Sequence, residues 1–215
     1  MGCTPHFRHP GSAAMTRPAP SDPAFRNSPS RGRCFVYVAP CTCEDLLKVG
    51  HSRDPLGRLQ ALHRRWYEFF DPGQAWLVEL DHVREAASLE SSLRRGLAEH
   101  NAPAPLTIRR EAAGHGEWFR GAQALLEGEC ARLAGAGHLV HVPARDWLRA
   151  ALLARADRLH AWTSAMLDVD ALDGPVDATP VTRAVRDALD AYAAFDIDVA
   201  PLLPPGVARW RGLPG

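Results

Sequence analysis

The feature that most constrains this chain is a short apolar run at residues 35–39, which reads Phe-Val-Tyr-Val-Ala. β-Branched and aromatic residues at successive positions predict a strand with two apolar faces, so both faces must be covered. Tyr37 is then buried, and its hydroxyl needs a hydrogen-bonding partner. The runs 46–50 and 75–80 are typical of two further strands joined by short connections. The sequence predicts an α+β fold, with a small, mostly antiparallel three-stranded sheet flanked by helices.

Asp54-Pro55 marks the start of a helix, because aspartate is a favoured N-cap and proline a favoured first helical residue. At about 100° per residue, an apolar face follows that contains Leu56, Leu59, Leu62 and Trp66. Arg58 lies at the rim of this face and His63 lies on it. A histidine in such a place is usually a satisfied core residue, so its position alone leaves a functional role open.

A second helix, from Val83 to about His100, has an apolar stripe that includes Leu93 and Leu97. Glu90 falls within about 40° of this stripe. A carboxylate beside a packing surface needs a cation or a metal, because burial of an unpaired charge is costly. A structural ion pair and a functional role are both open for Glu90.

Composition divides the chain into three parts. Residues 1–33 hold five arginines against Asp22 and many prolines and serines, which predicts a disordered basic arm. Residues 34–135 hold the predicted sheet, closed by a helix that follows Glu117-Trp118-Phe119. Residues 136–215 are expected to form a mostly helical appendage, with an edge strand near 138–142, a long helix at 145–166 and another at 181–192. Eight aspartates between 165 and 198 favour docking of a protein partner or a second copy of the chain over DNA contact.

Net charge is zero, so overall charge gives no sign of nucleic acid binding. The local candidates for DNA contact are arginines, in the arm and around the first helix: Arg31, Arg33, Arg53, Arg64 and Arg65. The arm is alternatively a solvated tail, or a segment upstream of a true start at Met15. Five irregularly spaced cysteines predict a cytoplasmic protein, and Cys41-Thr42-Cys43 lacks the paired spacing typical of structural zinc. No apolar run approaches the roughly 20 residues that a membrane span needs, so no membrane association is predicted.

Residues 34–121 resemble the GIY-YIG nuclease superfamily. Phe35-Val36-Tyr37 and Lys48-Val49-Gly50 stand where the two signature triplets stand, and further fragments follow in the family order: Ser52-Arg53-Asp54-Pro55, Arg58-Leu59, Leu89-Glu90 and Glu117-Trp118-Phe119. The pattern is most similar to the phage-type and uncharacterised bacterial branch, in which lysine replaces the second tyrosine and a Glu-Trp-Phe ending is common.

The resemblance implies a role for each matching residue. Glu90 corresponds to the single protein ligand of Mg²⁺ (or Mn²⁺), Tyr37 to the tyrosine that orients or deprotonates the attacking water, and Arg58 to the arginine on the scissile phosphate. His63 lies near a histidine that some members use. Lys48 replaces a phenol and is expected to contact phosphate or act as a base; a solvated lysine on an edge strand is the alternative.

Two function classes follow. The first is a metal-dependent endonuclease that hydrolyses DNA phosphodiester bonds by a one-metal mechanism. The second is a catalytically inactive GIY-YIG-like module that binds DNA or protein. The first requires Tyr37, Arg58 and Glu90 to converge. The departures at the first glycine, which is Phe35, and at the second tyrosine leave the choice open, as does a late family asparagine that has no clear counterpart near Glu117.

Overall fold

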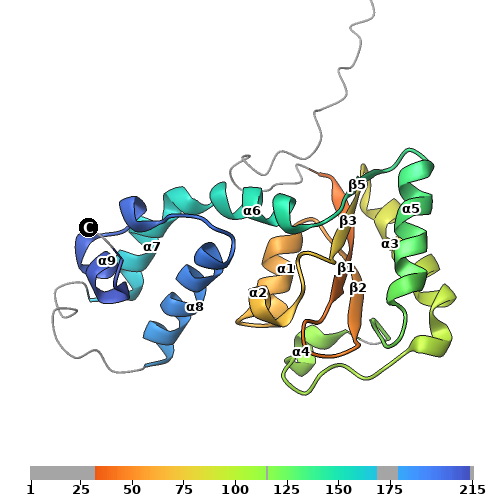
Figure 1. The fold of residues 1–215 in the computed structure, drawn as a ribbon, viewed down its shortest axis with the longest axis horizontal. Helices are drawn as coiled ribbons and strands as arrows, with labels where there is room; N and C mark the ends of the chain where they lie inside the picture. The colour runs from red at the N-terminus through yellow and green to blue at the C-terminus, as the bar shows by residue number, and fades with distance from the viewer. Residues whose placement is uncertain (1–31, 115, 169–178, 214–215) are drawn as a thin grey trace, which may run out of the picture.

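The computed structural model describes residues 32–114, 116–168 and 179–213 (Figure 1). Its sheet has five antiparallel strands in the order β4-β2-β1-β3-β5. The strands are β1 (Cys34–Pro40), β2 (Leu47–Ser52), β3 (Trp76–Leu80), β4 (Trp118–Phe119) and β5 (Leu139–His141). The α+β prediction is confirmed, but a sheet of three strands was too small. β5 confirms the edge strand expected near 138–142 and pairs with β3. β4 spans only two residues, too few for an alternating pattern to mark it.

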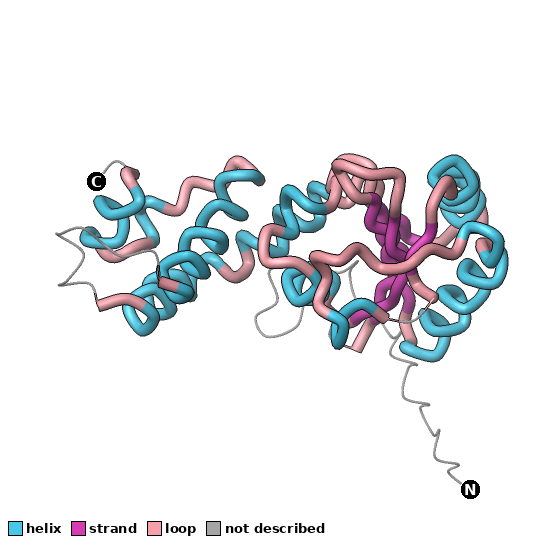
Figure 2. The backbone as a smooth tube through the Cα atoms, turned by 90° about the horizontal axis from the view of Figure 1, so that it is seen from below, coloured by secondary structure: helices cyan, strands magenta, loops and turns pink. Residues whose placement is uncertain are grey.

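The two faces of β1 bury different side chains, as its doubly apolar pattern predicted. Phe35, Tyr37 and Ala39 face one core, whereas Val36 and Val38 face the other. Helices cover both faces (Figures 1 and 2). The first face packs against α1 (Pro55–Leu62), α2 (Trp66–Phe69) and α6 (Arg145–Leu153), and the second packs against α3 (Val83–Gly96) and α5 (Gln123–Gly135).

Helix α1 begins where the sequence predicts. The Asp54 side chain accepts a hydrogen bond from the Gly57 amide at 3.0 Å, with Pro55 as the first helical residue. The helix ends at Leu62, and His63 is its C-cap. Trp66 therefore opens the separate helix α2 rather than extending the apolar face of α1.

The remaining helical segments are mostly C-terminal. They are η1 (Ala98–His100), α4 (Arg110–Ala113), η2 (Ala156–Arg158), α7 (Leu159–Met166), α8 (Pro180–Ala194), η4 (Ala200–Leu202) and α9 (Pro205–Arg211). The prediction of one long helix at 145–166 was wrong, because the chain breaks between α6 and α7 at η2. Leu148, Leu152 and Leu159 are nevertheless buried, so the break keeps both helices on the core.

The C-terminal helices share a core with the sheet. Phe195, which caps α8, is fully buried and stacks on Trp66 of α2 with 5.4 Å between ring centroids. Arg65 reaches Asp187 at 3.1 Å and Asp190 at 3.4 Å on α8. The expected basic arm lies outside the described residues, except for Gly32 and Arg33. Within the described ranges, no helix is long and apolar enough to cross a membrane.

Candidate functional site

Tyr37 lies across the strand pair β1–β2, directly over Gly50. The two residues are register partners, and a Cβ atom at position 50 would lie 2.4 Å from the Tyr37 hydroxyl. Glycine is therefore required for the phenol to lie flat over β2. Burial raises the pKa of Tyr37 to about 12, while a hydrogen bond from the Arg58 guanidinium partly opposes this shift. The predicted partner of the buried hydroxyl is thus Arg58, one turn into α1.

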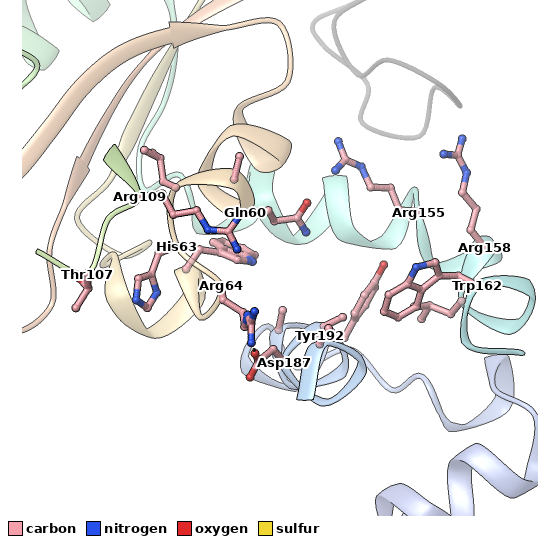
Figure 3. A pocket seen from close by; sticks show the side chains of 17 residues that line it. Gln60, His63, Arg64, Thr107, Arg109, Arg155, Arg158, Trp162, Asp187 and Tyr192 are labelled. Atoms are coloured by element: carbon pink, nitrogen blue, oxygen red, sulfur yellow. Dashed lines mark ion pairs between the residues drawn. The ribbon is translucent and has the colours of Figure 1, made fainter. Parts of the chain in front are cut away.

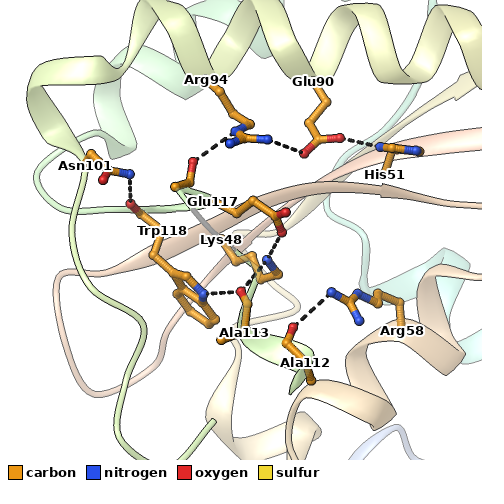
Figure 4. Close-up of polar contacts among 11 residues, drawn as sticks. Lys48, His51, Arg58, Glu90, Arg94, Asn101, Ala112, Ala113, Glu117 and Trp118 are labelled. Atoms are coloured by element: carbon orange, nitrogen blue, oxygen red, sulfur yellow. Dashed lines mark hydrogen bonds and ion pairs between the residues drawn. The ribbon is translucent and has the colours of Figure 1, made fainter. Parts of the chain in front are cut away.

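Lys48 lies on the same face of β2, two residues before Gly50. Its side chain has 0% exposure and its ammonium contacts the Glu117 carboxylate, with a second hydrogen bond to the Ala113 carbonyl at 3.2 Å (Figure 4). Burial lowers the pKa of Lys48, and the Glu117 carboxylate opposes that shift. The alternative of a solvated lysine on an edge strand is therefore wrong.

Glu90 is buried on α3, as its wheel position predicted, with 8% of its side chain exposed. One carboxylate oxygen contacts Nδ1 of His51, and the other lies 3.6 Å from the Arg94 guanidinium. Arg94 also donates to the Gly116 carbonyl at 2.9 Å. Figure 4 shows His51, Glu90 and Arg94 in a row beneath α3. The carboxylate is held between two basic side chains.

These residues form two groups on opposite faces of β2. His51 pairs with Val36 and faces α3, whereas Lys48 and Gly50 pair with Ala39 and Tyr37 and face α1. The groups are close enough for the charge of Glu90 to act on both Tyr37 and Lys48. They flank the stretch of β2 beyond Lys48, where the described pairing with β4 ends. Tyr37, Lys48 and Glu90 are buried, whereas His51 and Arg58 are half-buried and in reach of solvent.

Residues 109–114 and 116–117 cover the α1 side of β2. Arg58 donates to the Ala112 carbonyl at 3.0 Å, and Lys48 and the Trp118 indole both donate to Ala113. Both cations that the resemblance assigns to phosphate are therefore bonded to α4 or to the residues that follow it. Lys48 is fully buried beneath these residues, whereas Arg58 is half-buried.

The donor set fits a metal held by one carboxylate. No cluster of three or more histidine, cysteine or acidic side chains suited to a metal occurs within residues 32–114, 116–168 and 179–213. Mg²⁺ and Mn²⁺ accept carboxylate oxygen and keep several waters, so Glu90 could serve either ion if the ion replaced one of its contacts with His51 and Arg94. Glu90 would hold the ion.

The other predicted residues lie elsewhere. His63 stacks on Phe69 with 4.4 Å between ring centroids, and its buried Nδ1 has no hydrogen-bond partner among the described residues. Arg33 is buried and paired with Glu79 at 2.6 Å, and Arg64 and Arg65 face Asp187 at 3.7 and 3.1 Å. Arg53 is exposed beside the strand edge. Arg31 lies outside the described residues.

Sequence reasoning did not assign His51, Arg94 or Glu117 to the site. His51 could have been found from the alternation of side chains along a strand: it lies three positions after Lys48, an odd number, so it faces α3 while Lys48 faces α1. Asn101 is a further polar residue of this region: its amide donates to the Trp118 carbonyl at 3.1 Å and it bridges to Phe119.

Comparison with known proteins gives one match. Residues 34–134 match the family model of the T5orf172 domain. The matched stretch contains Tyr37, Lys48, Arg58, Glu90 and Glu117, and thus every residue of the two groups at β2. No curated protein and no solved structure matches the chain.

Proposed function

We propose that this protein is a metal-dependent endonuclease of the GIY-YIG type, which hydrolyses DNA phosphodiester bonds with a single Mg²⁺ or Mn²⁺ ion. The observation that carries the proposal is the buried Glu90 carboxylate, set between His51 and Arg94 on the opposite face of β2 from the Tyr37–Arg58 pair, yet close enough for its charge to act on Tyr37. His51 and Arg94 offset the cost of burying this charge, so what supports a ligand role is the action of the Glu90 charge on Tyr37 and Lys48 across the strand.

Arg58 and Tyr37 have different proposed roles in the hydrolysis. Arg58 binds the scissile phosphate once its bond to Ala112 is released, and its charge stabilises the negative charge that develops there. Tyr37 stays protonated at neutral pH, because its pKa is about 12, so its hydroxyl orients water rather than removing a proton from it. A metal bound at Glu90 would polarise the phosphate and make bound water more acidic.

His51 is the best-placed base. If its Nδ1–H donates to Glu90, its Nε2 is left as a proton acceptor, and a third of its side chain is exposed. Lys48 is proposed to hold Glu117 and Ala113 over the site. This role differs from the direct phosphate contact that the sequence led us to expect for Lys48.

A nicking assay on supercoiled plasmid tests the proposal. The parent protein should nick the plasmid with Mg²⁺ or Mn²⁺ and show no nicking in EDTA. Glu90→Ala should reduce the nicking rate at least 100-fold, which corresponds to a loss of about 2.7 kcal/mol of transition-state stabilisation. Glu85→Ala is the matched control, because Glu85 lies exposed on the same helix. A Glu90→Ala rate equal to that of the parent sinks the proposal.

A catalytically inactive module that binds DNA or protein is the second candidate. The observation that favours it is the covering of Arg58 and Lys48 by carbonyls of residues 112 and 113. A folded parent with no metal-dependent nicking but with metal-independent DNA binding would favour this candidate over the first.

A further inference from the structure

A cavity of about 770 Å³ lies between the sheet domain and the C-terminal helices, apart from the site at β2. Its walls come from the end of α1, the loop at 107–109, the η2–α7 region and α8 (Figure 3). Its volume lies within the range of about 300–1,000 Å³ that is typical of small-ligand sites. Neither half of the chain could form it alone.

The charged side chains of the cavity are mostly cationic. Four arginines line it, Arg64, Arg109, Arg155 and Arg158, against a single aspartate, Asp187. Asp187 offsets Arg64 at 3.7 Å, and Asp54, which is outside the lining, accepts from Arg155 at 2.6 Å. Arg109 is exposed at the cavity wall. This excess of positive charge suits a phosphate-bearing ligand.

Aromatic side chains form part of the apolar lining of the cavity. Trp66, Trp162 and Tyr192 line the cavity, and Figure 3 shows Trp162 and Tyr192 side by side beneath the two η2-region arginines. Trp162 is half-buried and Tyr192 is buried, so a base would reach their rings from inside the cavity, beside the arginines. Nucleobases stack on aromatic faces in such surroundings. A simple inorganic anion would leave these rings unused.

His63 supplies an unused polar atom. It lines the cavity, and its buried Nδ1 has no hydrogen-bond partner within the part of the chain that the structure describes. Buried polar atoms are normally satisfied, so such an atom in a cavity wall is expected to meet a ligand group. In Figure 3 His63 lies near Thr107 and Arg109, away from Trp162 and Tyr192, so a ligand group other than the stacked base would be its partner.

We propose that this cavity binds a nucleotide, with the phosphate on the arginines and the base stacked between Trp162 and Tyr192. The same chemistry is offered by a free mononucleotide and by an unstacked nucleotide of single-stranded DNA. The assignment goes beyond the nuclease proposal and does not require that Glu90 hold a metal. It gives residues 136–215 a function as one wall of the site.

Fluorescence anisotropy of a labelled dT6 oligonucleotide, measured in EDTA so that no cleavage occurs, tests this assignment. Saturable binding is expected, and dTMP should compete at least fivefold better than either thymidine or inorganic phosphate, since both halves of the ligand contribute. Binding of dT6 at least tenfold tighter than dTMP would identify single-stranded DNA as the source, and equal binding would identify the free nucleotide. Both results support a nucleotide site.

Two variants and a control locate the binding. Arg109→Glu and Trp162→Ala should each weaken dT6 at least fivefold, the second through loss of stacking. Arg84→Glu makes the same charge change at an exposed position on α3, across the sheet, and should leave the affinity unchanged. Arg109 is exposed, so its variant keeps the fold. No saturable binding below about 1 mM, phosphate competing as well as dTMP, or equal affinity of parent and Arg109→Glu would each overturn the proposal.

Discussion

At Gly50 the backbone of β2 lies against the ring of Tyr37, and a Cβ atom there would lie 2.4 Å from the Tyr37 hydroxyl. We predict that Gly50→Ala displaces the phenol, weakens its bond with Arg58 and lowers the free energy of unfolding by about 1–3 kcal/mol through overpacking. The nicking rate should fall at least tenfold. Chemical denaturation and the plasmid assay measure the two effects.

Gly128→Ala is the control for this substitution. Gly128 lies inside α5 with no atom near its Cβ position, so alanine should raise stability by about 0.5–1 kcal/mol. Equal behaviour of the two variants would show that the phenol is not held over Gly50.

The pKa of Tyr37 predicts a loss of stability at alkaline pH. Since the folded pKa is about 12 and the unfolded value is 10.0, the contribution is complete below pH 10 and declines as pH rises through 12. Between pH 9 and 11 the free energy of unfolding should fall by roughly 1.4 kcal/mol on account of Tyr37, at about 1.36 kcal/mol per pKa unit. Tyr37→Phe should lack this part of the slope.

The slope must be measured as a difference between parent and variant. Burial also raises the pKa of Tyr67 and Tyr192, which adds to the loss of protein stability at alkaline pH. The pKa of Lys48 is lowered instead, so its contribution to the free energy of unfolding rises as pH rises toward 10.5. These contributions are common to both proteins. Urea denaturation at pH 9 and 11 gives the result, and identical slopes would exclude a buried, protonated Tyr37.

At the scale of the element, the segment made of residues 109–114 and 116–117 is fixed to the sheet through the Lys48–Glu117 pair. Glu117→Gln should destabilise the protein by about 3 kcal/mol, because it leaves a fully buried ammonium without a carboxylate. Lys48→Met should do less harm, since 21% of the Glu117 side chain is exposed and can reach water. The double variant should lose less than the sum.

An exposed pair on α5 provides the comparison. Glu129 and Arg132 lie 2.6 Å apart, and Glu129→Gln should change stability by under about 1 kcal/mol. Thermal denaturation of the five proteins distinguishes a buried anchor from a surface contact. Additive effects at Lys48 and Glu117 would mean that the pair does not hold the segment.

The elements predicted from sequence are those with a strong local signal. The three long strands lie within two residues of the predicted runs, and α1 starts at its predicted cap, because apolar runs and capping residues act locally. The end of α1 at His63 and the end of α6 near Ala154 have no such local signal. Ala154 and Ala156 favour helix, so the break between α6 and α7 depends on packing against the core. The burial of Glu90 was predictable because a carboxylate on an apolar stripe is anomalous, whereas the contacts of His51 and Glu117 arise only through sheet pairing.

At the scale of the whole molecule, the sheet domain and the C-terminal helices are joined by Phe195, which is fully buried, stacks on Trp66 and lies beneath the Arg145 guanidinium at 4.9 Å. We predict that Phe195→Ala lowers the free energy of unfolding of the entire chain by about 3–5 kcal/mol. Because one core runs from the sheet into α8 and α9, the loss should appear in a single cooperative transition. Far-UV and near-UV circular dichroism in urea should therefore give coincident midpoints for parent and variant.

Leu125→Ala is the matched control, since Leu125 is 54% exposed on α5 and its truncation should shift stability by no more than about 0.5 kcal/mol. Two separate transitions, with Phe195→Ala moving only the weaker one, would contradict a shared core. In that case the C-terminal helices would unfold as an independent unit, and the cavity between them and α1 would open before the sheet melts. The nucleotide affinity of Phe195→Ala would then fall at urea concentrations where Glu90 and His51 still keep their contact.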